Sequence, residues 1–91
     1  MQLRGDIVTL TGRAPISNIK TFGSWFSRYQ DWSADEYLKV IADYRKNGFP
    51  LDALTIDTNW RASSDGTGYE LNTTSFPDMG YFLAKANAEG V

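Results

Sequence analysis

The stretch GFPLDALTIDTNW, from Gly48 to Trp60, decides the fold, because it joins a helix end, an apolar run and a polar residue. Gly48 suits the left-handed position just past a helix, and Pro50 stops the helix from resuming. Residues 51–56 form a strand-length apolar run without strict alternation, which is typical of a strand covered by helices. Asp57 follows at once. Since the carboxyl ends of parallel strands face ligand crevices in α/β proteins, Asp57 is either a functional residue or the start of a loop.

The composition narrows the classes of protein to consider. The 91 residues make one small domain or a piece of a larger one. A formal net charge of −2 with scattered lysines and arginines indicates neither a nucleic-acid partner nor an anionic membrane surface. With 42% apolar and 22% charged residues, the chain is expected to fold rather than stay disordered. Its apolar runs all fall short of the roughly 20 residues that span a membrane.

The missing residue types exclude several kinds of catalytic site. The sequence has no cysteine and no histidine, so disulfides, thiol chemistry, Ser-His-Asp triads and HExxH zinc sites are excluded. We expect no metal and no cofactor, because the sequence shows no cluster of metal ligands. Any chemistry must rest on carboxylates, tyrosines, lysines or hydroxyls. The lack of cysteine leaves the cellular compartment open.

Apolar periodicity predicts two helices. The first begins after Ser33, which forms an S-x-x-E capping box with the glutamate three residues on, and ends before Gly48. The second is expected from Asp78, as N-cap, to Glu89. Their apolar stripes are Tyr37, Val40, Ile41 and Tyr44 in the first helix and Met79, Phe82, Leu83 and Ala86 in the second.

The remaining segments complete an α/β order of elements. Residues 21–26 are a further strand candidate, and the first dozen residues suit either a short helix or an edge strand. The polar segment Arg61 to Pro77 is longer than the usual βα connection of about 2 to 6 residues, and such loops often build binding sites. Parallel strands joined by a helical crossover are the default for this order. Because a two-stranded sheet has open edges and little core, we expect a part of something larger or copies that complete one another.

These segments together resemble the start of the catalytic barrel of glycoside hydrolase family 31, the α-glucosidase and α-xylosidase family. The matching sequence segments occur in the family's order and at about its spacing, and they cover nearly the whole chain from Leu10. They are LTGRAPI at Leu10 to Ile16, FGSWFSRY at Phe22 to Tyr29, DEYLKVIADYRKNGFPLDALTIDTNW at Asp35 to Trp60, and GYELNTTSFPDMGYFLAKANAEGV at Gly68 to Val91. The resemblance implies a partial (β/α)8 TIM barrel, with residues 1–20 as a lead-in segment and residues 21–91 as the first two βα units.

The resemblance also implies which residues contact a bound sugar. Asp57, at the end of the second strand, is implied to line the sugar subsite nearest the cleaved bond and to accept hydrogen bonds from substrate hydroxyls. Trp60 is implied to be a wall of the pocket. Trp25 and Arg28, after the first strand, are implied to lie at the same barrel mouth. The alternative for the aromatic residues is core packing, which is what most aromatics in a small domain do.

The implied function is that of a fragment of a retaining α-glycoside hydrolase acting on α-linked glucosides or xylosides. Retaining hydrolysis needs two carboxyl groups about 5 to 5.5 Å apart. In the family's order both catalytic aspartates belong beyond Val91, so no catalytic residue is assigned and the isolated chain is expected to be inactive. The expected partners are a carbohydrate and either the remainder of the barrel or further copies bound through open strand edges.

Two alternatives stay open at this point. The chain is also compatible with a non-catalytic, self-associating carbohydrate-binding or structural module. An enzyme of another α/β type, in which Asp57 does acid-base work, is the weakest reading because no carboxylate partner is visible.

Overall fold

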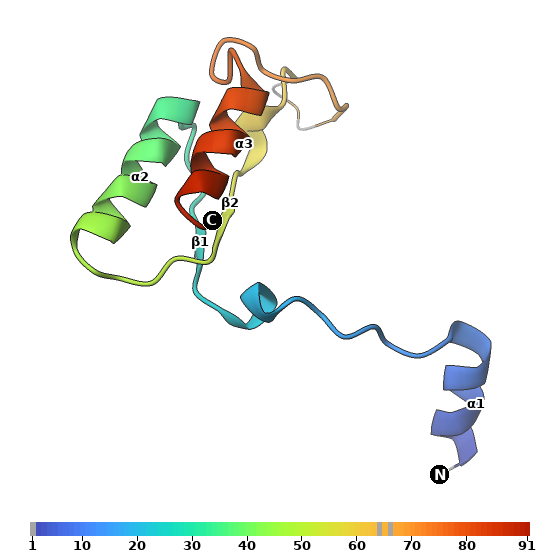
Figure 1. Cartoon of the computed structure of the whole chain (residues 1–91). Helices are drawn as coiled ribbons and strands as arrows, with labels where there is room; N and C mark the ends of the chain where they lie inside the picture. Colours follow the sequence, from blue (N-terminus) through green and yellow to red (C-terminus); the bar gives the residue numbers. More distant parts are fainter. Residues whose placement is uncertain (1, 64, 66) are drawn as a thin grey trace.

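The computed structural model describes residues 2–63, 65 and 67–91, and it consists of a lead-in segment and a body in which helices cover a small sheet (Figure 1). The lead-in contains α1 (Gln2–Thr11) and the 3-10 helix η1 (Ile19–Phe22). The body contains β1 (Trp25–Ser27), α2 (Ala34–Lys46), β2 (Ala53–Thr55), the 3-10 helix η2 (Thr58–Trp60) and α3 (Met79–Ala88). The amino-terminal segment is therefore helical, which decides between the helix and the edge strand that the sequence left open.

The sheet has two parallel strands, β1 and β2, with Trp25 beside Ala53. Both α2, which connects the strands, and α3 lie on one face of this sheet (Figure 1). Phe26 and Leu54 pack against the buried residues of these helices. Since side chains alternate across a strand, their neighbours lie on the opposite face, where Trp25 is 58% exposed. The chain is a mixed fragment of helices and a parallel sheet, and this arrangement is consistent with part of a barrel.

The two helices of the body, α2 and α3, begin and end where the sequence predicts. Before α2, the backbone N–H of Ser33 donates to Glu36 Oε2 at 2.7 Å, which completes the capping box. Gly48 follows α2 in the left-handed region, with φ at 71°. Before α3, Asp78 Oδ1 accepts a hydrogen bond from the backbone N–H of Tyr81 at 2.8 Å. Local capping therefore sets these boundaries.

The first strand begins later than predicted. Thr21 and Phe22, expected in the strand, belong to η1 instead. The side-chain oxygen of Asn18 accepts a hydrogen bond from the backbone N–H of Lys20 at 3.0 Å, and this cap favours a turn over an extended strand. The boundary expected between residues 20 and 21 falls inside η1.

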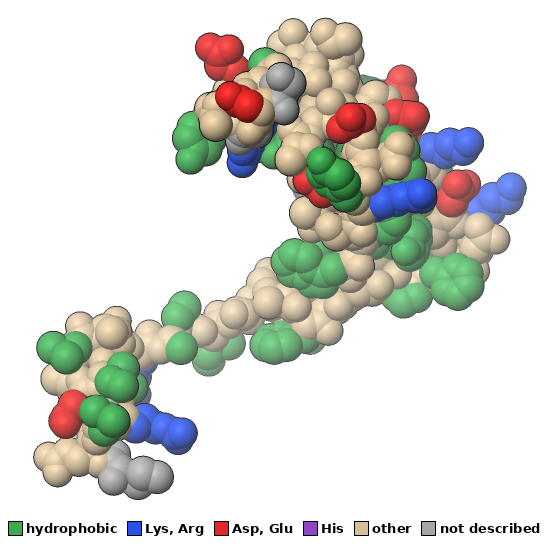
Figure 2. All heavy atoms as spheres, turned by 180° about the vertical axis from the view of Figure 1, so that it is seen from behind, with side chains coloured by type: hydrophobic (Ala, Val, Ile, Leu, Met, Phe, Trp, Pro, Cys, Tyr) green, Lys and Arg blue, Asp and Glu red, His purple; other side chains and the backbone are tan. Residues whose placement is uncertain are grey.

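The lead-in segment exposes apolar side chains. All described residues from position 2 to position 23 are exposed. Among them, Leu3 is 73% exposed and Ile16 is fully exposed. Figure 2 shows such apolar side chains standing on the surface of this segment. Its end is tied to the body, because Lys20 Nζ donates to the carbonyl of Gly90 at 3.1 Å.

Asp52 joins the two strands at their amino ends. It precedes β2, which starts at Ala53, although the sequence placed residue 52 within the strand-length run of residues 51–56. Its carboxylate accepts a hydrogen bond from the backbone N–H of Ser24 at 2.8 Å, and the Ser24 carbonyl accepts one from the Asp52 N–H at 2.9 Å. A Cβ at Gly23 would collide with this carboxylate. The glycine is therefore required for the close approach of the two segments.

The core is centred on Tyr37, which is fully buried on α2. The ring of Phe76 stacks on it at 6.2 Å between centroids, and Phe82 of α3 meets it edge-on at 6.5 Å. Phe76 comes from the long loop, so the loop supplies part of the core. A second cluster of Ile41, Leu51 and Ala86 extends the core between α2 and α3.

The hydroxyl of Tyr37 connects this core to the end of β2. It accepts a hydrogen bond from the backbone N–H of Asp57, with 3.4 Å between nitrogen and oxygen. Burial raises the pKa of Tyr37, because the charged phenolate would lose its hydration. The hydrogen bond from the Asp57 N–H opposes that shift, and the negative charge of the Asp57 carboxylate adds to it.

Removing the Asp52 carboxylate is expected to destabilise the sheet. Asp52→Ala should lower the free energy of unfolding by about 1 to 2 kcal/mol, because the Ser24 N–H loses a charged acceptor. Asp52→Asn keeps an acceptor oxygen and should lose less. Urea denaturation followed by circular dichroism measures both. The exposed Asp43→Ala is the matched control, and an equal loss in the two alanine variants would contradict the role of Asp52.

The buried Tyr37 predicts a loss of stability at high pH. An unfolded tyrosine ionises near pH ~10, and the folded Tyr37 ionises at a higher pH. Its contribution is therefore fully present below about pH 10 and is lost as the pH rises through the folded pKa. Tyr37→Phe removes this contribution, so its free energy of unfolding should fall less steeply above about pH 10. Urea denaturation across this range measures both proteins, and parallel curves would show that Tyr37 is not the responsible group.

Candidate functional site

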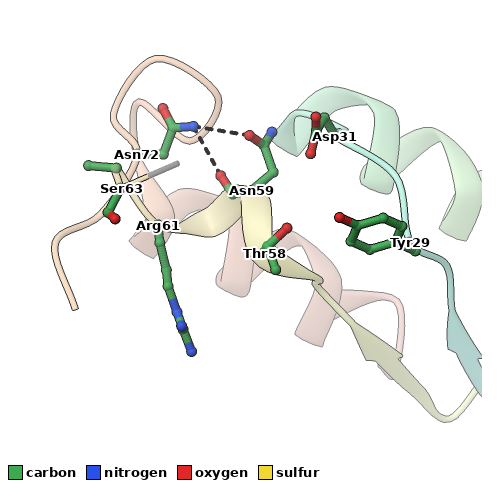
Figure 3. A pocket seen from close by; sticks show the side chains of 8 residues that line it. Tyr29, Asp31, Thr58, Asn59, Arg61, Ser63 and Asn72 are labelled. Carbon is green, nitrogen blue, oxygen red and sulfur yellow. Dashed lines mark hydrogen bonds between the residues drawn. The ribbon is translucent and has the colours of Figure 1, made fainter. Parts of the chain in front are cut away.

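The candidate site lies where β1 and β2 end. Because the strands are parallel, the segments that follow them open at the same edge of the sheet. Arg28 and Tyr29 follow β1, and Asp57 follows β2. Figure 3 shows that Tyr29, from the first of these segments, faces Thr58 of η2 across a pocket.

Asp57 is held at both its backbone and its side chain. Its backbone N–H donates to the buried Tyr37 hydroxyl, as described above. Its Oδ1 accepts a hydrogen bond from the Thr58 N–H at 2.7 Å and so caps η2. The residue is half-buried. Since a carboxylate offers about four lone-pair sites, this cap leaves capacity for hydroxyl groups of a ligand. Asp57 thus starts the loop and presents a carboxylate at the same time.

A network of amide groups fixes η2 against the long loop. Asn59 Nδ2 donates to the Trp32 carbonyl at 3.1 Å and to Ser75 Oγ at 3.0 Å. Asn72 Nδ2 donates to the carbonyl and to Oδ1 of Asn59, at 3.0 and 3.2 Å (Figure 3). Asn72 Oδ1 also accepts a hydrogen bond from the Ser75 N–H at 3.2 Å. The link to Asn59 was not predicted, because it joins residues far apart in sequence.

The long loop folds back on η2, which accounts for its length. Arg61 and Leu71 form an antiparallel bridge. Beside it, the Asn72 N–H donates to the Trp60 carbonyl at 2.8 Å. The loop then returns to the core at Phe76, which is 1% exposed. Its two ends are therefore anchored close to the carboxyl ends of the strands.

Asp65 organises the outer part of this loop. It accepts hydrogen bonds from the Ser63 hydroxyl, from the Thr67 N–H at 2.9 Å and from the Thr67 hydroxyl at 2.7 Å. The Ser63 hydroxyl, followed by the two groups of Thr67, lowers the pKa of Asp65 to about 2. The side chain stays charged at neutral pH and is engaged in this turn.

A polar pocket of about 350 Å³ lies beside η2. The described lining residues include Thr58, directly after Asp57, but neither Asp57 nor Trp60. They come from the segment after β1 and from η2 with its following loop: Tyr29, Asp31, Thr58, Asn59, Arg61, Ala62, Ser63 and Asn72. The sequence did not single out this set. The polar residues that follow each strand end were the sequence signal that could have identified this lining, because the carboxyl ends of parallel strands face the ligand crevice.

Trp60 and Arg28, both predicted to meet a sugar, lie at this carboxyl edge. Trp60 is half-buried against the core, and the Arg61 guanidinium lies 4.8 Å from the centre of its ring. Arg28 is exposed, and its guanidinium lies 5.2 Å from the centre of the Trp32 ring. Trp32 itself stacks on Phe26 with 6.0 Å between ring centroids, and both rings pack against the core.

Trp25 lies elsewhere, and its predicted position after the first strand was wrong. It is the first residue of β1, because the turn at η1 delays the start of the strand. It therefore lies at the amino end of the sheet, opposite the end that carries Asp57. There it lines an apolar groove of about 310 Å³ together with Asp52 and Leu83. The structure does not bring Trp25 together with the other predicted site residues.

The described carboxylates do not converge on a metal-binding arrangement. In residues 2–63, 65 and 67–91, no group of three or more His, Cys, Asp or Glu side chains is placed to hold a metal ion. Asp57 and the polar pocket offer hydrogen-bonding groups at this edge of the sheet. Separately, the helices of the described ranges are all too short or too polar to cross a membrane.

Comparison with known proteins assigns the family. A sequence model described as the TIM-barrel domain of glycosyl hydrolases family 31 matches residues 14–91. The chain is also 29% identical over 68 residues to an alpha-xylosidase of Saccharolobus solfataricus, and this match covers 75% of the chain and 9% of that protein. The family resemblance seen in the sequence is confirmed. The chain belongs to glycosyl hydrolase family 31.

Proposed function

We propose that the chain supplies substrate-binding residues of a retaining α-glycoside hydrolase, and that Asp57 accepts hydrogen bonds from hydroxyls of an α-linked glucoside or xyloside. The observation that carries this proposal is the fixed, half-buried carboxylate of Asp57 just past the end of β2. A group that is already held loses little freedom on binding, so more of the hydrogen-bond energy appears as affinity. The similarity to an alpha-xylosidase supports α-linked xylosides among the substrates.

In this proposal the chain binds the sugar and carboxylates outside it cleave the bond. Retaining hydrolysis needs a nucleophile and an acid/base carboxyl group about 5 to 5.5 Å apart. Three carboxylates of this chain have structural tasks: Asp52 accepts from Ser24, Asp65 organises the loop and Asp78 caps α3. Asp57 contributes to the rate where its hydrogen bond to a sugar hydroxyl strengthens as positive charge develops on the ring.

For the fold, we infer a lead-in segment and the first two βα units of a (β/α)8 barrel. One face of the sheet is covered by helices, and the other is open, as expected for the inner wall of a barrel. The groove along β2 and α3 holds the exposed Leu83, which belongs to the predicted apolar stripe of α3. A further strand from the remainder of the barrel fits there. A second copy bound at the same groove, forming a self-associating module, is the alternative.

The proposed role of Asp57 is tested by sugar binding. Asp57→Asn keeps the shape and an acceptor oxygen but removes the charge, so affinity for methyl α-xyloside or methyl α-glucoside should fall by about tenfold. Chemical-shift titration of the 15N-labelled chain measures the affinity and maps the site, with shifts expected at the amides of Asp57 and Thr58. The control is Asp43→Asn, an exposed carboxylate on α2 that should bind as the wild type does.

Two results would contradict the proposal. Unchanged sugar affinity in Asp57→Asn, in a variant whose amide spectrum otherwise matches the wild type, would remove Asp57 from the binding site. Hydrolysis of an aryl α-glycoside by the purified chain would contradict the assignment of bond cleavage to other carboxylates.

A further inference from the structure

The turn that joins α2 to β2 contains the pair Asn47 and Gly48, which has no part in the role proposed for Asp57. It leads to the amino end of β2, whereas the candidate site lies at the carboxyl end (Figure 1). Asn47 differs from the other asparagines of the chain because a glycine follows it. A residue with a side chain follows each of the others, which are Asn18, Asn59, Asn72 and Asn87.

An asparagine before a glycine is open to an intramolecular reaction. The backbone nitrogen of Gly48 attacks the amide carbon Cγ of Asn47, and the lack of a Cβ on glycine leaves this nitrogen unhindered. A bond forms between the nitrogen and Cγ, the Cγ–Nδ2 bond breaks, and Nδ2 leaves as ammonia with the proton of the Gly48 nitrogen. Water then opens the resulting succinimide ring to aspartate or isoaspartate. The reaction therefore needs only water and adds a negative charge.

Both residues are accessible to the water that the reaction needs. Asn47 and Gly48 are exposed. A Cβ built on Gly48 would have no neighbouring atom within 4 Å, so the surroundings of the turn are open. The leaving ammonia and the incoming water therefore meet no steric barrier at this place.

The backbone at the end of α2 nevertheless holds the reacting atoms apart. The ψ angle of Asn47 is 3°, so the bond to the Gly48 nitrogen is aligned with the Cα–N bond of Asn47 when viewed along Cα–C. Ring closure requires alignment with the Cα–Cβ bond instead, because Cγ is attached to Cβ. The backbone of Asn47 must therefore rotate out of this conformation before the nitrogen reaches Cγ.

Hydrogen bonds at the helix end maintain this unreactive conformation. Asn47 Nδ2 donates to the Asp43 carbonyl at 2.8 Å, which directs the side chain back along α2. The Gly48 N–H donates to the Arg45 carbonyl at 3.2 Å, with Gly48 in the left-handed region that ends many helices. The attacking nitrogen and the leaving amide are thus both engaged in the cap of α2.

We propose that Asn47 is a deamidation site that the carboxyl-terminal cap of α2 keeps unreactive. The reaction proceeds in the molecules whose helix end is open, at a rate proportional to their fraction. The product favours further opening, because a carboxylate does not donate to the Asp43 carbonyl and its charge is unfavourable beside the carbonyl groups that end a helix. Isoaspartate also adds a methylene group to the backbone between α2 and β2.

Incubation of the full chain in the folded and in the unfolded state tests the assignment. The chain is kept in mildly alkaline buffer with or without guanidinium chloride, and the peptide that contains Asn47 is followed by mass spectrometry. The unfolded chain should convert Asn47 to aspartate and isoaspartate about tenfold faster than the folded chain, because the folded reaction awaits opening of the cap. Asn87 is the internal control, since it is exposed at the end of α3 but precedes an alanine, and it should stay unmodified.

A variant that carries the product measures how strongly the Asn47 amide holds the helix end. Asn47→Asp should lower the urea midpoint of unfolding, since it loses the hydrogen bond to Asp43 and places a negative charge at the end of α2. Asn87→Asp makes the same change of charge at the end of α3 and should lower the midpoint less. Circular dichroism during urea denaturation measures both variants.

Each of four results would overturn the inference. Equal rates in the folded and the unfolded chain would show that the helix end does not control the reaction. An Asn47 that stays unmodified in the unfolded chain, or an Asn87 that reacts as fast, would show that the pair with Gly48 is not a reactive site. An unfolding midpoint of Asn47→Asp equal to that of the wild type would show that the amide does not hold the cap. The role of Asp57 is tested separately, by sugar binding.

Discussion

The buried side chain of Tyr37 is the constraint on which the body of this chain depends. Its ring is the contact point of α2, α3 and the long loop, and its hydroxyl accepts the backbone N–H of Asp57. One side chain therefore has to satisfy both the packing of the core and the position of the candidate site. The loop is drawn inward at Phe76 for the same reason, because it supplies a ring to this cluster. The hydrogen bond to Tyr37 links the core to the backbone that carries the Asp57 carboxylate.

Hydrogen bonds between the long loop and η2 hold the polar site in place on this small body. The amides of Asn59 and Asn72 close the loop over η2, so that the crevice edge of the sheet is built from local contacts. The opposite face and the outer edge of the sheet are open by contrast, with Trp25 and Leu83 more than half exposed.

Local rules predicted the features that depend on neighbours in sequence. The capping box at Ser33 and the left-handed Gly48 delimit α2 through contacts within a few residues. Asp57 comes directly after the apolar run, so its place at the end of β2 follows from the order of residues in the chain. The late start of β1 was missed because residues 21–26 fit a strand pattern, whereas the Asn18 cap favours a turn over residues 19–22. The Asn59 to Asn72 link and the bond between Asp52 and Ser24 depend on long-range geometry, which residue spacing does not encode. The pocket lining was missed for the same reason.

Amide hydrogen exchange on the full chain tests the central claim most directly, which is that core, loop and candidate site form one cooperative unit around Tyr37. The account predicts that the amides of Asp57, Asn72 and Phe76, each hydrogen-bonded in the structure, exchange with protection similar to that of Ile41 in α2. Exchange of these three amides at the rate of an open loop, while Ile41 stays protected, would contradict the account. In that case the loop and Asp57 would open independently of the core.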